Sequence, residues 1–181
     1  MTRMVALLRA VNVGGTRKVP MADLRELLTA EGFTDVATYI QSGNVVLSSK
    51  LGAAATAAAF EAAFARRFGF DAPVVVRTAA AWAPYAGDGP FPEARHDRPR
   101  LLHLGLAAGA MKPGVLEAVR AKAVAGEQVE LVGDALWIDF PAGVAGSKIT
   151  PAVLDRAAGA PVTLRNWNTV RKLQEMLAAP R

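Results

Sequence analysis

The sequence predicts an α+β protein built from two ferredoxin-like (split β-α-β) subdomains packed together. Three observations lead to this prediction. Apolar segments in residues 1–85 follow the order β-α-β-β-α-β, the same order recurs in residues 100–181 with one more helix at the end, and a stretch rich in proline and glycine separates them. A β-α-β-β-α-β unit usually folds as an antiparallel sheet with both helices on one face, and 181 residues suffice for two such units.

Local patterns of apolar residues define the elements of the first subdomain. Apolar runs predict buried strands, apolar residues at helical spacing predict helices, and Ser-Gly between two strand-like runs predicts a hairpin. In chain order we expect a strand over 4–10, a helix over 20–31, strands over 36–41 and 44–49, a helix over 53–68 and a strand over 72–78.

Three phenylalanines spaced four residues apart in the second of these helices predict a face buried in the core. Three leucines of the preceding helix are expected to face them. The six residues are Phe60, Phe64, Phe68, Leu24, Leu27 and Leu28.

The same reasoning applies to the second subdomain, where Gly133-Asp134 marks the hairpin. Residues 86–99 contain three prolines and two glycines, so we expect a linker or a long surface loop there. The elements that follow are expected to be a strand over 100–106, a helix over 113–124, strands over 128–132 and 136–140, a helix over 150–158, a strand over 162–165 and a helix over 166–178.

Composition excludes several classes of function. The chain has no cysteine, which excludes disulfides, thiol nucleophiles and cysteine zinc sites, and its two histidines exclude a histidine-rich metal centre. We expect no metal. No apolar run approaches the ~20 residues of a membrane span, and the first residues lack a signal-peptide pattern, so a cytoplasmic protein is expected. A net charge of +5 permits an anionic partner without requiring nucleic acid.

The first candidate binding segment is the loop between the first strand and the first helix. It carries Asn12, Gly14, Gly15, Arg17 and Lys18. Glycines allow backbone N–H groups to approach an anion, and the two basic residues add positive charge, although the loop matches neither nucleotide-binding glycine motif. The alternative is an ordinary turn with solvated cations. In either case we expect a positive φ at one or both glycines.

The second candidate segment is the hairpin tip, with Gln41, Ser42 and Asn44. In a split β-α-β unit the first two strands run in the same direction, so this tip is expected at the same sheet edge as the loop over residues 12–18. Amide side chains both donate and accept hydrogen bonds. The alternative is a well-formed turn, because these residue types are common in turns.

The third candidate set lies in the second subdomain and comprises Ser147, Lys148, Arg165, Asn166 and Asn168. Asn166 or Asn168 is suited to cap the last helix, and Arg165 stands at the positive end of that helix, where an anion would compensate it. We expect Lys148 and Arg165 to share an accessible concavity with their charges within about 10 Å. A salt bridge from Arg165 to a carboxylate is the alternative.

A histidine and an aspartate on neighbouring strands raise the question of catalysis. A His103–Asp139 pair would orient a general base, but no nucleophile is linked to it by the sequence, and a histidine packed between subdomains is the alternative. Catalytic residues therefore stay unknown.

A resemblance to a known family is carried by the N-terminal segment MVALLRAVNVGGTRKVPMADLRELLTAEGFTDVATYIQSGNVVLSS and the C-terminal segment TLRNWNTVRKLQEML. They resemble the two ends of a bacterial family known only as a domain of unknown function, number 1697 in its series; Ser147-Lys148 stands where that family carries a Ser-Lys pair. The resemblance implies two α+β subdomains and supplies no reaction or cofactor. The family usually has Gly-Ile where this chain has Ala10-Val11, which suggests that position 10 needs no positive φ.

Three functions stay open. The preferred interpretation is a binding module for a small anionic, phosphate-bearing ligand; the alternatives are an enzyme acting on a phosphorylated or nucleotide substrate, and a structural or partner-binding protein. Nucleic acid is allowed but not favoured, because exposed strand aromatics are limited to Tyr39 and Trp137 at most. The cofactor and the oligomeric state are unknown from the sequence.

Overall fold

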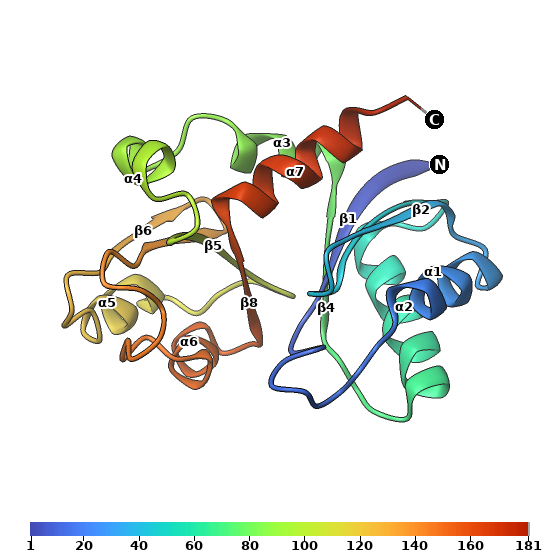
Figure 1. Cartoon of the computed structure of the whole chain (residues 1–181), viewed down its shortest axis with the longest axis horizontal. Coiled ribbons are helices and arrows are strands. Elements are labelled where there is room, and N and C mark those ends of the chain that lie inside the picture. The colour runs from blue at the N-terminus through green and yellow to red at the C-terminus, as the bar shows by residue number, and fades with distance from the viewer. Residues whose placement is uncertain (181) are drawn as a thin grey trace. The chain divides into compact units, whose positions relative to one another are not determined.

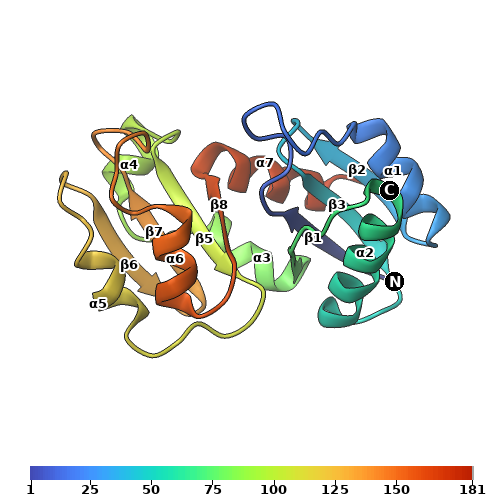
Figure 2. The same ribbon diagram turned by 90° about the horizontal axis from the view of Figure 1, so that it is seen from below.

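The computed structural model describes residues 1–180, which divide into two compact units. The first comprises Met1–Ala83 and the chain from Leu173 onward, and the second comprises Pro84–Lys172. Each unit contains one four-stranded antiparallel sheet with two helices on one face (Figures 1 and 2). The predicted α+β class with two ferredoxin-like subdomains is confirmed. None of the helices in residues 1–180 has the length and apolar character that a membrane crossing needs.

The first unit has the strand order β2-β3-β1-β4, in which every neighbouring pair is antiparallel. Because β1 and β2 are both antiparallel to β3, they run in the same direction. Their C-terminal ends therefore lie at the same end of the sheet, and we call such a row of strand ends a sheet edge. Its elements are β1 (Thr2–Leu8), α1 (Met21–Ala30), β2 (Thr34–Tyr39), β3 (Asn44–Ser49), α2 (Ala53–Phe68) and β4 (Val74–Thr78), and α3 (Ala79–Ala86) follows.

The core of this unit lies between the sheet and its two helices. Phe60 and Phe64 are fully buried, as the spacing predicts, whereas Phe68 is only partly buried where it packs against the core. The expectation for the leucines is wrong at one position, since Leu27 is only half-buried and lies outside the core cluster. Leu24 and Leu28, four residues apart, share the inward face of α1, whereas Leu27 lies about 100° around the helix from Leu28.

The second unit repeats the topology with the order β6-β7-β5-β8. The ends of β7 and β8 therefore lie at the same sheet edge. Its elements are α4 (Pro92–Asp97), β5 (Leu102–Ala107), α5 (Val115–Arg120), β6 (Gln128–Val132), β7 (Ala135–Asp139), α6 (Pro151–Ala158), β8 (Val162–Asn166) and the beginning of α7 (Trp167–Ala178).

Residues 86–99, expected to be a linker or a long loop, include the helix α4. Proline at its first position favours the helix start, Ala94 is buried, and the Arg95 guanidinium lies 5.3 Å from the Trp167 ring centroid. Six residues contain too few turns for apolar periodicity to reveal a helix. The packing of this segment onto its own unit is what makes it regular.

Candidate functional site

The loop after β1 and the hairpin tip between β2 and β3 are joined at one edge of the first sheet. Asn12 Nδ2 donates to the backbone oxygens of Val19 at 3.0 Å and Gln41 at 2.7 Å, and the Val19 N–H donates to Asn12 Oδ1 at 2.7 Å. The expected convergence of the two segments is therefore present. We call residues 12–18 and 41–44 the loop–hairpin edge.

Strained backbone is concentrated at and beside this edge. Of the six non-glycine residues with positive φ in residues 1–180, four are here: Ala10 (φ 56°), Asn12 (55°), Arg17 (49°) and Ile40 (50°). Asparagine tolerates this conformation, but a β-branched isoleucine is a genuine outlier, and each such residue costs about 1–2 kcal/mol relative to the right-handed region. The surrounding contacts hold the chain in a shape that its sequence disfavours.

Both loop glycines have positive φ, 60° at Gly14 and 76° at Gly15, which confirms the prediction for this pair. A Cβ atom added at either glycine would meet nothing within 4 Å. Conformation, and not a close approach of other atoms, is therefore what requires glycine here.

The inference about position 10 is wrong. Ala10 adopts φ 56°, so the glycine that the family usually carries there fits the local backbone. Alanine gives no sign of the conformation in the sequence, because the strain comes from the way the chain leaves β1.

Replacing Ala10 by glycine should raise the free energy of unfolding by about 0.5–1 kcal/mol. The left-handed strain of alanine is removed, while the greater freedom of glycine in the unfolded chain offsets part of the gain. Ala10 is exposed, so little packing is lost. Urea denaturation measures the change, with Ala62→Gly on the exposed side of α2 as the control, where about 1 kcal/mol should be lost. A loss at both positions would contradict the assigned backbone conformation.

Positive charge and backbone donors are exposed at the loop–hairpin edge. The Arg17 guanidinium lies 5.3 Å from the centroid of the Phe70 ring, and Lys18 is exposed. Within residues 1–180 the backbone N–H groups of Gly14, Gly15 and Lys18 donate no hydrogen bond. Together they make a surface that favours an anion.

The hairpin residues serve different purposes. Gln41 and Ser42 are exposed. The Asn44 side chain is fully buried and donates to the Tyr39 backbone oxygen at 3.1 Å, so it stabilises the turn.

Ser147 is bonded to the residue that precedes β6, whereas Arg165 lies in β8, and β6 and β8 are the two outer strands of the second sheet. Glu127 directly precedes β6, and its Oε1 accepts a hydrogen bond from the Ser147 hydroxyl at 2.5 Å. This bond is the main reason that the pKa of Glu127 is lowered. Arg165, in β8, donates to Thr163 Oγ1 at 2.7 Å and to the Leu164 oxygen at 2.8 Å. The approach of Lys148 to Arg165 within about 10 Å stays a prediction.

Burial lowers the pKa of the Arg165 guanidinium to about 10. The remaining residues of the third candidate set either cap a helix or face solvent. Asn166 Oδ1 accepts the Thr169 N–H at 3.0 Å at the start of α7, which is the capping role predicted for Asn166 or Asn168. Asn168 and Lys148 are exposed.

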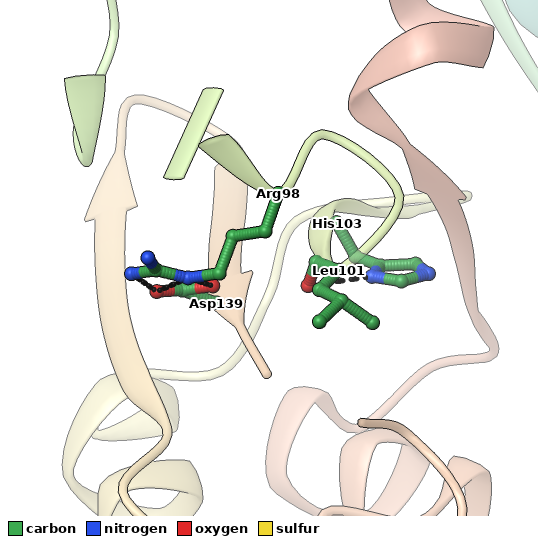
Figure 3. Close-up of polar contacts among 4 residues, drawn as sticks. All are labelled: Arg98, Leu101, His103 and Asp139. Atoms are coloured by element: carbon green, nitrogen blue, oxygen red, sulfur yellow. Dashed lines mark hydrogen bonds and ion pairs between the residues drawn. The ribbon is translucent and has the colours of Figure 1, made fainter. Parts of the chain in front are cut away.

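The His103–Asp139 pair is absent, because the two side chains lie on opposite faces of the sheet. Asp139 is paired in register with Leu102 and accepts a bidentate contact from Arg98, whose Nε and Nη2 lie 3.0 and 2.6 Å from its two oxygens (Figure 3). His103 Nδ1 instead lies 3.1 Å from the Leu101 oxygen, and its ring packs edge-on against Phe140. The expectation of a possible carboxylate-oriented base is therefore wrong.

The burial of His103 predicts a dependence of stability on pH. Desolvation lowers the pKa of His103 below its usual 6.5. The unfolded chain therefore binds the proton more readily, so the stability present above pH 6.5 should be lost as the pH falls towards the lower pKa of the folded state. His103→Gln should remove this part of the pH profile of unfolding, and His96→Gln, at a side chain that is 90% exposed, should leave it unchanged. Equal effects of the two variants would contradict the assignment.

A cavity of about 270 Å³ in the second unit involves residues that sequence reasoning missed. It lies between α5 and α6 and includes three basic residues, Lys112, Lys122 and Arg156. They come from three segments with no common motif or period, so only the fold brings them together. No group of three or more histidine, cysteine, aspartate or glutamate side chains suited to a metal occurs in residues 1–180.

A family model described as "Protein of unknown function (DUF1697)" matches residues 1–137. The chain belongs to the DUF1697 family. The match includes the whole loop–hairpin edge of this DUF1697 protein, whereas Ser147, Lys148 and Arg165 lie beyond it.

Solved structures extend the comparison at the level of the fold. The conserved bacterial protein SP0830 from Streptococcus pneumoniae is similar with a TM-score of 0.77 and 22% identity, covering 97% of this chain and 98% of that one. At this identity the likeness concerns the fold alone. An unknown protein from Galdieria sulphuraria matches with 14% identity over 91% of this chain and 97% of that one, but its TM-score of 0.26 supports no argument. No curated protein matches the chain.

Proposed function

We propose that this DUF1697 protein binds a small anionic, phosphate-bearing ligand at the loop–hairpin edge. The concentration of strained backbone at this edge carries the proposal. Strained residues persist only where surrounding structure imposes them, and they cluster at ligand-binding segments. Asn12 supplies that constraint by bonding to both the loop and the hairpin tip.

The chemistry of the edge favours an anion over other ligands. The unused N–H groups of Gly14, Gly15 and Lys18 carry partial positive charge, and the formal charges of Lys18 and Arg17 add to it. Charge-assisted bonds from such groups to phosphate oxygens are roughly twice as strong as neutral ones. The exposed position makes the attraction weaker at high salt.

Binding is favoured over catalysis at this edge. Residues 12–18 and 41–44 contain no histidine, aspartate or glutamate, so the most common general bases are absent from the edge. An enzyme acting on a phosphorylated substrate would need such a group from elsewhere in the fold. The second candidate function therefore has less support.

A thermal-shift titration with inorganic phosphate, glycerol 3-phosphate and AMP tests the proposal. A ligand that binds only the native state at 100 times its Kd should stabilise the protein by about 2.7 kcal/mol. Lys18→Gln should weaken binding about tenfold, which corresponds to the loss of one charge-assisted bond.

Lys50→Gln is the matched control, because Lys50 is an exposed lysine that follows β3 at the opposite edge of the same sheet. It should bind like the unmodified protein. If no probe raises the unfolding temperature, or if both lysine variants lose affinity equally, the loop–hairpin edge is not the site.

A further inference from the structure

The strongest unexplained feature of the second unit is the cavity between α5 and α6. The two helices lie side by side on one face of the sheet (Figures 1 and 2). Apolar residues that line the cavity include Ala118, Val153 and Ala157, and its charged members are Lys112, Lys122 and Arg156. No acidic residue lines it.

The three cations have no ion pair within residues 1–180, and all three are exposed. Elsewhere in the same unit comparable arginines are paired, as Arg120 is with Glu130 at 2.8 Å. Three positive charges that line one cavity without an acidic residue favour an anion there.

The partial negative charges at the C-terminal ends of α5 and α6 are too small to compensate these three positive charges. Arg156 lies in the last turn of α6, and Lys122 follows the end of α5. A helix C-terminus carries about half a negative charge, so two such ends offset only about one of the three positive charges. The cavity keeps an excess of positive charge.

Both the backbone and the side chain of Lys112 contact the end of α6. Its N–H donates to the Ala158 oxygen at 2.9 Å, and its aliphatic chain lies against Gly159. A Cβ atom at Gly159 would lie 2.7 Å from Lys112 Cδ and 2.8 Å from Cγ, closer than carbon atoms approach. Gly159, the left-handed residue (φ 73°) that ends α6, therefore lies directly under the Lys112 side chain.

We propose that this cavity is a second site, which binds a phosphate monoester with its phosphate group among Lys112, Lys122 and Arg156. Lysine acts as a point charge towards phosphate, and arginine can donate two parallel bonds to it. The proposal concerns the second unit and stands independently of the loop–hairpin edge.

A neighbouring cavity indicates where the organic part of the ligand lies. It has a volume of about 530 Å³ and shares Lys112, Pro113 and Gly114 with the basic cavity. Met111, Leu116 and Leu131 line it together with two acidic residues, Glu117 and Asp134. A ligand extending from the phosphate would place carbon atoms here and offer a hydroxyl or amino donor to Glu117.

Amide NMR spectra recorded during titration with inorganic phosphate and with glycerol 3-phosphate test this site. Signals of Lys112 and of residues 114–122 and 153–159 should shift with both probes, and signals of Met111 and Leu131 should shift only with the ester. Arg156→Gln and Lys122→Gln should each weaken binding about tenfold. Arg171→Gln, at an exposed arginine of α7, carries the same change of charge and should leave the affinity unchanged.

The spectra separate this site from the loop–hairpin edge. Shifts confined to residues 12–18 and 41–44 would overturn the cavity proposal and support the first site. Shifts at the cavity alone would support the cavity and contradict the first site. An affinity that falls equally in Arg156→Gln and Arg171→Gln would show a nonspecific charge effect and overturn the cavity. The same spectra show whether each variant is folded.

Discussion

Replacing Phe64 by alanine should lower the free energy of unfolding by about 3–5 kcal/mol, the cost of removing a large aromatic side chain from a packed core. Phe64 is fully buried. Its ring centroid lies 4.7 Å from that of Phe68 and 5.2 Å from that of Phe70, in tilted and edge-on arrangements that add to the hydrophobic contribution. Urea denaturation analysed by linear extrapolation measures the loss.

Phe68→Ala is the matched control on the same face of α2. Phe68 is only half-buried, so its truncation should cost clearly less than that of Phe64. A loss below about 1 kcal/mol for Phe64→Ala would contradict the placement of this helical face in the core.

The same phenylalanine cluster connects the core to the loop–hairpin edge. Phe70 packs on Phe64 from one side, and the Arg17 guanidinium lies over the Phe70 ring. Truncation of Phe64 removes support from the ring that positions Arg17. The core and the loop–hairpin edge are therefore in contact through Phe70 and Arg17.

Local patterns in the sequence predicted helices and strands correctly where an apolar period extends over many residues or where turn residues mark the ends of an element. The predicted ranges 44–49, 53–68 and 128–132 coincide with β3, α2 and β6. In contrast, α3 and α4 were not predicted, because one has a proline within eight residues and the other has only six. Segments this short depend on tertiary packing for their conformation.

The topology of a split β-α-β unit was sufficient to predict that the two segments of the loop–hairpin edge meet. It was not sufficient to predict whether His103 and Asp139 share a face of the sheet. Alternation shows which residues of one strand share a face, but it does not determine the pairing register between neighbouring strands. The register pairs Leu102 with Asp139 and so places Asp139 on the Leu102 face. The basic cavity was invisible in the sequence, because Lys112 and Arg156 meet only when α5 packs on α6.

The bidentate pair between Arg98 and Asp139 should be the most sensitive polar contact of the second unit. The Asp139 side chain is 1% exposed. Its partner Arg98 follows α4 directly, does not belong to a strand and is 33% exposed. The hydrogen bond to Asp139 is the main cause of the raised pKa of Arg98. Arg98→Met keeps most of the side-chain volume but leaves the buried carboxylate without its partner.

Removal of the partner leaves the buried Asp139 carboxylate uncompensated, so Arg98→Met should lower the free energy of unfolding in urea denaturation clearly more than the removal of an exposed ion pair does. The double variant Arg98→Met/Asp139→Leu should recover most of the loss, because an apolar pair requires no compensation for a buried charge. Arg120→Met is the control, since both members of its pair with Glu130 are nearly half exposed and such surface pairs contribute about 1 kcal/mol or less. If Arg98→Met and Arg120→Met destabilise the protein equally, or if the double variant is no more stable than Arg98→Met alone, burial of the Asp139 charge is not what makes this contact sensitive.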